Sequence, residues 1–192
     1  MSFEAVAVIT NVLMVIWLIG EIVQIFKSRR REGNVRDAGT FSGMWVTIVI
    51  TVVMGNLLPA WTKNDPAFFG LPIWLIYVGL AMIVAGIFFR FYSIRYLGRY
   101  FTVRVSIHEN HSLIQTGPYK WLRHPSYTGA WLAFVGVGLV SGTWSELLVW
   151  AIFPLIGLLR RIRVEESVLL THFGDVYGKY RQRTWRLIPW VY

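Results

Sequence analysis

Long apolar runs with almost no charge limit the fold of this chain more than any other feature. Residues 5–26 contain a single charged side chain, Glu21, and residues 41–62 and 72–89 contain none. About 20 apolar residues make a helix long enough to cross the ~30 Å hydrocarbon core of a bilayer. We therefore predict a transmembrane helix from each of these three runs.

Two further charge-free runs, residues 128–145 and 147–159, lie close together in the second half of the chain. The second run is too short to span by itself, since 13 residues make only about 20 Å of helix. We predict a helical hairpin that turns at 140–145 and extends past the apolar runs at its other end. A re-entrant hairpin is the alternative.

The overall composition excludes several classes of protein. Hydrophobic residues make up 55% of the chain and charged residues 15%, whereas a soluble domain has about 25% charged residues. The chain has no cysteine, which removes disulfides, thiolate metal sites and a cysteine nucleophile. No basic segment precedes the first apolar run, so we do not expect a cleavable signal peptide. We predict one membrane domain over residues 1–192.

The basic residues predict how the chain sits in the membrane. With spans at about 5–26, 41–62, 72–97, 126–141 and 144–160, one side holds 18 of the 19 Lys and Arg residues. The positive-inside rule then places the N-terminus outside and the C-terminus in the cytoplasm, in the plasma membrane if the host is prokaryotic. This orientation places residues 98–127 and 160–192 in the cytoplasm. The net charge of +9 then favours contact with anionic lipid rather than nucleic acid.

Two clusters on the predicted cytoplasmic side combine charges with helix ends. Arg123 and His124 precede Pro125, which can open a helix at its first turn. An Arg there suits a carboxylate or phosphate, although the spacing alone favours a side chain that reaches for lipid headgroups. Arg161 and Glu165 share one face of a helix at i,i+4. They offer a cation and a carboxylate to a cavity, although the spacing alone favours a surface pair.

Other residues have simpler structural interpretations. We expect Glu21 to pair with Arg90 or Arg95 near the membrane interface, although an intramembrane carboxylate is also a functional candidate. Tyr177 and Tyr180, at i,i+3, either line a pocket or cover the bundle, and covering is the more common role. Gly174 is a plausible helix end, and Gly136 and Gly138 are most simply explained by close helix packing. The four scattered histidines predict no metal site.

Together these residues resemble the isoprenylcysteine carboxyl methyltransferase family and its relatives, the membrane phospholipid N-methyltransferases. The matching stretches are His111-Ser-Leu-Ile-Gln-Thr-Gly-Pro-Tyr119, Arg123-His-Pro-Ser-Tyr127-Thr-Gly129, Arg161, Glu165-Glu166, Phe173-Gly174, Tyr177, Tyr180 and Ile188-Pro189. Gly136-Val-Gly138 and the Glu pair also resemble the Gly-x-Gly and Glu-Glu by which the phospholipid enzymes are described. The chain looks like a compact, prokaryotic-style core of the family.

The resemblance implies an all-α integral membrane protein with five transmembrane helices, the last two a hairpin, and a cytoplasmic cofactor loop and C-terminal helix. It implies S-adenosylmethionine as methyl donor and S-adenosylhomocysteine as product. The implied cofactor residues are His111, Ser112, Leu113, Ile114, Tyr119, His124, Pro125, Ser126, Tyr127 and Glu165. Arg161 is implied at the methyl acceptor, so Arg161 and Glu165 are the predicted catalytic residues.

The implied reaction is methyl transfer to a lipophilic acceptor at the cytoplasmic face, first of all to the carboxylate of an isoprenylcysteine-like substrate. Methylation of a phospholipid or lipid amine is the nearest alternative. An NADPH-dependent reductase of the sterol type shares a related C-terminal architecture, but those enzymes are much longer. A non-enzymatic membrane scaffold would leave the ordered Arg-His-Pro and Glu-Glu residues unexplained. The sequence does not specify the oligomeric state.

Overall fold

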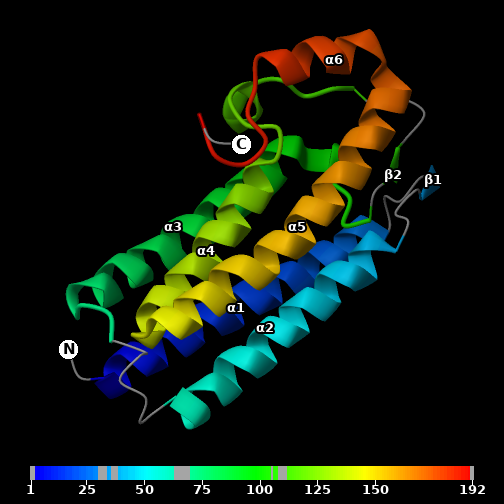
Figure 1. Cartoon of the computed structure of the whole chain (residues 1–192). Coiled ribbons are helices and arrows are strands. Elements are labelled where there is room, and N and C mark those ends of the chain that lie inside the picture. Colours follow the sequence, from blue (N-terminus) through cyan, green and yellow to red (C-terminus); the bar gives the residue numbers. More distant parts are fainter. Residues whose placement is uncertain are drawn as a thin grey trace.

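The computed structural model describes residues 3–29, 34–35, 39–62, 70–104, 106–107 and 112–190. The described chain is mainly helical (Figure 1). Its long helices are α1 (Phe3–Arg29), α2 (Thr40–Thr62), α3 (Trp74–Leu97), α4 (Pro125–Ser141) and α5 (Trp144–Phe173). Shorter elements are η1 (Gly98–Tyr100), η2 (Gly117–Lys120), α6 (Asp175–Gln182) and the antiparallel pair β1 (Asn34–Val35) and β2 (Ser106–Ile107).

Helices α1 to α5 run in alternating directions along one bundle, and α6 lies across one end of it (Figure 1). Helix α1 begins at the opposite end of the bundle from α6. Two helical segments, Glu4–Ser28 and Trp74–Tyr100, are long and apolar enough to cross a membrane, and Thr40–Gly55 is a shorter apolar helix. The helices coincide with the predicted runs, whereas the number that span the bilayer stays a prediction.

The predicted hairpin is present. Helix α4 ends at Ser141, Gly142 takes a left-handed conformation, and α5 begins at Trp144, with the Thr143 side chain accepting a hydrogen bond from the backbone of Glu146. Helix α5 continues without interruption beyond the predicted membrane span of 144–160 to Phe173, in agreement with the helical spacing expected for Arg161 and Glu165. This extension carries Arg161 and Glu165 beyond the apolar run and toward α6.

Glycines let α3 and α4 approach closely. A Cβ at Gly129 would lie 2.6 Å from the backbone N of Arg90, and one at Gly136 would lie 2.6 Å from the carbonyl O of Gly79. Contacts of this kind need residues without side chains. The packing interpretation of Gly136 is therefore confirmed, and this glycine does not line the polar cavity described below.

The expected pairing of Glu21 is also confirmed, with Arg90 as its partner. The Arg90 guanidinium donates from Nε to Glu21 Oε1 and from Nη2 to Oε2, the latter at 2.6 Å. Trp17 Nε1 donates to the same carboxylate at 2.8 Å, and Arg90 Nη1 donates to the carbonyl O of Ser126 at 3.2 Å. The pair thus joins α1 and α3 to the first turn of α4.

Candidate active site

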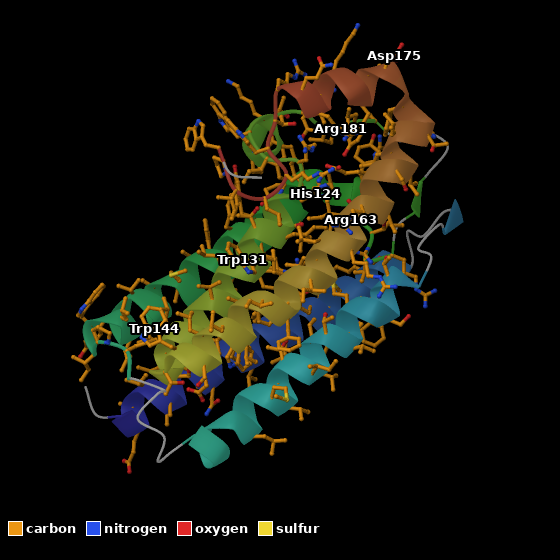
Figure 2. The ribbon with its side chains drawn as sticks, in the orientation of Figure 1. His124, Trp131, Trp144, Arg163, Asp175 and Arg181 are labelled. Carbon is orange, nitrogen blue, oxygen red and sulfur yellow. The ribbon has the colours of Figure 1, made fainter. Side chains whose placement is uncertain are left out.

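A polar cavity lies at the end of the bundle that carries α6. Its walls come from the chain around η1, from residues 112–114, from η2, from the start of α4, from the far end of α5 and from α6. In Figure 2, His124 and Arg181 are near this end, whereas Trp144 is at the opposite end. We call it the polar cavity throughout.

The start of α4 is held in place by the C-terminal segment. The backbone N of Arg123 donates to the Trp185 carbonyl at 2.8 Å, and that of His124 donates to the Arg186 carbonyl at 3.1 Å. Helix α4 begins at Pro125 as predicted, because a missing N–H costs little in the first turn of a helix. His124 and Tyr127 therefore project from a fixed turn, with their rings stacked 5.5 Å apart.

Glu166 is the centre of a buried ion cluster beside the cavity. Arg123 Nε donates to Glu166 Oε1 at 2.7 Å, Arg186 Nε donates to Oε2 at 2.9 Å, and His124 Nε2 lies 3.5 Å from Oε1. Burial by itself raises the pKa of the Glu166 carboxyl, but His124, Arg186 and Arg123 outweigh this effect and lower the pKa to about 2. Glu166 therefore stays ionised at neutral pH.

This cluster corrects the headgroup interpretation of Arg123. Its side chain is buried and bonded to Glu166, and it also donates to the carbonyl groups of Arg181 and Thr184. The guanidinium lines the polar cavity, but its hydrogen bonds go to the protein. Arg123 thus connects the start of α4 to α5 and to the C-terminal segment.

Glu165, the neighbour of Glu166, has a different environment. The Tyr127 hydroxyl donates to Glu165 Oε2 at 2.7 Å and accepts from Arg161 Nε at 2.8 Å. Arg161 also donates from Nη2 to the carbonyl O of Val103. Arg161 is only 2% exposed, which corrects the surface-pair interpretation, whereas the Glu165 side chain is 29% exposed. The three side chains form a hydrogen-bonded chain along the cavity wall.

The structure brings most of the predicted site residues together. Those that line the polar cavity are Ser112, Leu113, Ile114, Tyr119, His124, Ser126, Tyr127, Arg161 and Glu165. Pro125 is fully buried and starts α4 without lining the cavity. His111 lies outside the described residues. The roles of all these residues in catalysis or binding stay predictions.

Comparison with known proteins relates this geometry to one family. A sequence profile described as the isoprenylcysteine carboxyl methyltransferase family matches residues 78–171. The stretch runs from within α3 to the end of α5 and contains the start of α4 and both glutamates. Residues 78–171 belong to the isoprenylcysteine carboxyl methyltransferase family.

Individual relatives carry the same name. The chain is 34% identical over 125 residues to protein-S-isoprenylcysteine O-methyltransferase B of Arabidopsis thaliana, covering 62% of this chain and 61% of that one. It is 30% identical over 125 residues to the Homo sapiens protein-S-isoprenylcysteine O-methyltransferase, covering 62% of this chain and 42% of the human one. The chain therefore matches about three fifths of the plant relative and less than half of the human one.

The fold is shared as well. The structure of a eukaryotic intramembrane Ras methyltransferase, an isoprenylcysteine carboxyl methyltransferase, matches with a TM-score of 0.57 at 25% identity, covering 82% of this chain and 55% of that chain. Helical architecture and membrane location are thus common to this chain and the family.

Two further cavities lie next to the polar cavity, and each shares wall residues with its neighbour. We call the smaller one the junction cavity and the larger one the apolar cavity. The junction cavity shares Tyr127 and Arg161 with the polar cavity, and it shares Glu21 and Arg90 with a larger apolar cavity of about 450 Å³. The walls of the apolar cavity come mainly from apolar side chains of α1, α2, α4 and α5. Arg161 therefore lies in the walls of the polar and junction cavities, and the junction cavity in turn borders the apolar one.

Several cavity residues were not among the predicted site residues. Tyr177 and Tyr180 are buried and line the polar cavity, which agrees with the pocket-lining alternative and corrects the preferred interpretation as a cover for the bundle. Their i,i+3 spacing was the available signal, since it places both rings on one face of a short helix. Val168 and Leu169, one turn beyond Glu165, also line the cavity, and only the continuation of α5 reveals them.

Proposed function

We propose that this protein transfers a methyl group from S-adenosylmethionine to the carboxylate of an isoprenylcysteine-like acceptor, at the cytoplasmic face of its membrane. The N-terminus is then outside and the end with α6 is cytoplasmic. The observation that carries the proposal is Arg161, a buried cation in the walls of both the polar and the junction cavity. Through Tyr127 it is hydrogen-bonded to Glu165 on the polar side.

The polar cavity fits the methyl donor in chemistry. Leu113 and Ile114 offer apolar surface to a purine ring, and Glu165 offers a carboxylate to cationic or hydroxyl groups. The His124 ring also lines the cavity, and its Nε2 lies 3.5 Å from Glu166 Oε1, so the carboxylate helps to fix the position of the ring. When bound, S-adenosylmethionine supplies a methyl group activated by a sulfonium centre, and S-adenosylhomocysteine is the product. The proposed donor site comprises His111, Ser112, Leu113, Ile114, Tyr119, His124, Pro125, Ser126, Tyr127 and Glu165.

Arg161 would hold the acceptor carboxylate at the edge of the donor site. A guanidinium matches the geometry of a carboxylate, and the apolar cavity behind the junction suits a prenyl chain. A carboxylate needs no general base before it attacks a methyl group, so the protein has to align the reactants and exclude water. Such alignment contributes roughly 7–11 kcal/mol in well-oriented reactions.

The buried charge favours this acceptor over a lipid amine. A protonated amine next to Arg161 would meet a like charge in a buried place, which raises its free energy. The phospholipid N-methyltransferase alternative therefore ranks second, and the reductase and the scaffold rank below it.

The donor is tested by thermal stability of the detergent-purified protein with S-adenosylmethionine, S-adenosylhomocysteine and NADPH. A ligand at 100 times its dissociation constant stabilises the folded state by about 2.7 kcal/mol. We expect a rise in Tm with the first two ligands only. A rise with NADPH alone would instead identify a reductase, and no rise with any ligand would favour the scaffold.

The acceptor is tested with labelled methyl donor and three candidates: an N-acetylated S-farnesyl cysteine, its methyl ester, and vesicles of phosphatidylethanolamine. We expect label in the free acid alone. Arg161→Gln should lower kcat/KM for the free acid by roughly 10- to 150-fold, the equivalent of a hydrogen bond to a charged group. Arg163→Gln is the matched control, because this exposed arginine lies on the same helix outside the cavity (Figure 2). Equal activity of the two variants would refute the role of Arg161.

A further inference from the structure

Four buried tyrosines line the polar cavity, and three of their hydroxyl groups are used within the protein. Tyr119 donates to the carbonyl O of Ser93 at 3.3 Å, Tyr127 donates to Glu165, and Tyr180 donates to the carbonyl O of Tyr119 at 2.7 Å. The fourth, Tyr177, is 1% exposed, and its hydroxyl makes no hydrogen bond with any residue that the structure describes. A buried hydroxyl without a partner destabilises the fold, whereas phenylalanine would fill the same space without that cost.

The backbone holds Tyr177 firmly in this position. Gly174, at a φ of +52°, turns the chain sharply from α5 into α6, and three residues later the Tyr177 ring lies 6.0 Å from that of Tyr180. The Tyr180 hydroxyl in turn fixes α6 to the chain around η2. The hydroxyl of Tyr177 is therefore brought to the cavity by an anchored helix.

The charges around Tyr177 keep its hydroxyl protonated. Burial raises the pKa of Tyr177, and the Glu166 and Glu165 carboxylates raise it further, against the opposing effect of Arg123. A neutral phenol has one proton to donate and two lone pairs to accept with. Tyr177 thus offers the cavity a complete hydrogen-bonding group at physiological pH.

One other buried side-chain polar atom of the described residues lacks a hydrogen bond, namely Nε2 of His124, but this atom faces the Glu166 carboxylate at 3.5 Å. His124 comes from the start of α4 and Tyr177 from α6, so the two atoms are supplied by separate elements. Both residues line the polar cavity, but the Tyr177 hydroxyl, unlike His124 Nε2, has neither a hydrogen bond nor an ion-pair contact with any described residue. A ligand in that cavity accounts for the Tyr177 hydroxyl.

We infer that the Tyr177 hydroxyl is a hydrogen-bonding contact for the methyl donor, so that α6 forms part of the donor site. This inference rests on the proposed function. The contact is assigned to the donor because Tyr177 lines the polar cavity and neither the junction cavity nor the apolar cavity. We place the acceptor at Arg161 and in the junction and apolar cavities, which Tyr177 does not line.

The test compares Tyr177→Phe with Tyr180→Phe, two variants that each remove one hydroxyl from the same helix. Tm of the purified protein is measured without ligand, and the dissociation constant for S-adenosylhomocysteine is then measured by calorimetry. Tyr177→Phe should leave Tm of the free protein unchanged or raise it, because it removes an unpartnered hydroxyl, and should weaken binding by about 3- to 12-fold. Tyr180→Phe should lower Tm of the free protein, because its hydroxyl bonds the Tyr119 carbonyl.

Two results would overturn the inference while leaving the proposed function intact. One is wild-type affinity for S-adenosylhomocysteine in Tyr177→Phe. The other is a fall in Tm of free Tyr177→Phe as large as that of Tyr180→Phe, which would make the hydroxyl a structural group. If the wild-type protein itself fails to bind S-adenosylhomocysteine, the proposed function is wrong and the inference is overturned with it.

Discussion

Replacing Glu166 by glutamine should destabilise the protein far more than the same change at Glu165. Glu166 accepts hydrogen bonds from two guanidinium groups, those of Arg123 and Arg186, and its side chain is only 5% exposed. A neutral amide in place of this carboxylate would leave both cations without their counter-charge. Removing one partner of a buried ion pair costs about 3–5 kcal/mol, which corresponds to a fall in Tm of about 6–20 °C for a chain of this size.

Glu165→Gln is the matched control, since it makes the same chemical change one residue earlier in α5. The Glu165 side chain is 29% exposed, and a glutamine oxygen can still accept from the Tyr127 hydroxyl. We expect a change in stability below about 1 kcal/mol. Methyl transfer should nevertheless fall sharply, because the carboxylate faces the proposed donor site.

Both variants are measured by thermal unfolding without ligand and by binding of S-adenosylhomocysteine. The reasoning predicts opposite profiles: a low Tm for Glu166→Gln, and a normal Tm with weak binding for Glu165→Gln. A wild-type Tm for Glu166→Gln would refute the claim that this carboxylate holds the cluster together. Equal falls in Tm for the two variants would refute the division of roles between the adjacent glutamates.

Three further predictions concern stability. The pKa of Glu166 is lowered from 4.5 to about 2 in the folded protein, so its stabilisation is complete above about pH 5 and is lost as pH falls toward 2. Acid titration of Tm should show a loss equivalent to roughly 2–3 kcal/mol over that interval in the wild-type protein and a smaller loss in Glu166→Gln. Glu21→Gln should lower stability by about 3–5 kcal/mol because it leaves the Arg90 charge buried and unpaired. Glu4→Gln, at an exposed position on the same helix, should change Tm little. Equal falls in Tm for these two variants would contradict the role of the Glu21–Arg90 pair. Gly129→Ala should lower the free energy of unfolding by about 1–3 kcal/mol, because the new Cβ would lie 2.6 Å from the backbone of α3. Gly178→Ala is the matched control, since no atom lies within 4 Å of its new Cβ. This second change should raise helix stability by up to about 1 kcal/mol.

Local sequence predicted the scaffold well, because the features that form it are local. Apolar runs indicated the helices, Pro125 indicated the start of α4, and Gly174 indicated the end of α5. The pairing of Glu21 with Arg90 also followed from the sequence, since both charges lie near the same end of predicted spans, where an unpaired charge is costly. The helices and their ends depend on preferences that are satisfied within one helix, whereas Glu21 and Arg90, 69 positions apart, could be matched because each is a rare charge near a predicted span.

The environment of the site could not be predicted in the same way. Spacing favoured a surface pair for Arg161 and Glu165, because the helical repeat cannot reveal that other parts of the chain cover that face of α5. The hydrogen bonds of Arg123 join it to residues 43 to 61 positions later in the chain. Contacts at that separation leave no periodic pattern in the sequence, so the resemblance to the family, rather than the pattern, indicated the cavity residues.

The attachment of the C-terminal segment has a consequence for the order in which the site is built. Trp185 and Arg186 receive the backbone hydrogen bonds of Arg123 and His124, and the Leu187 carbonyl accepts from the Thr128 hydroxyl at 2.7 Å. These residues follow helices α1 to α6 in the chain. A nascent chain can therefore place every one of these helices while the start of α4 still lacks its final supports. Synthesis thus finishes the membrane part first and the proposed catalytic face last, so we expect an incomplete chain to leave the methyl donor unused.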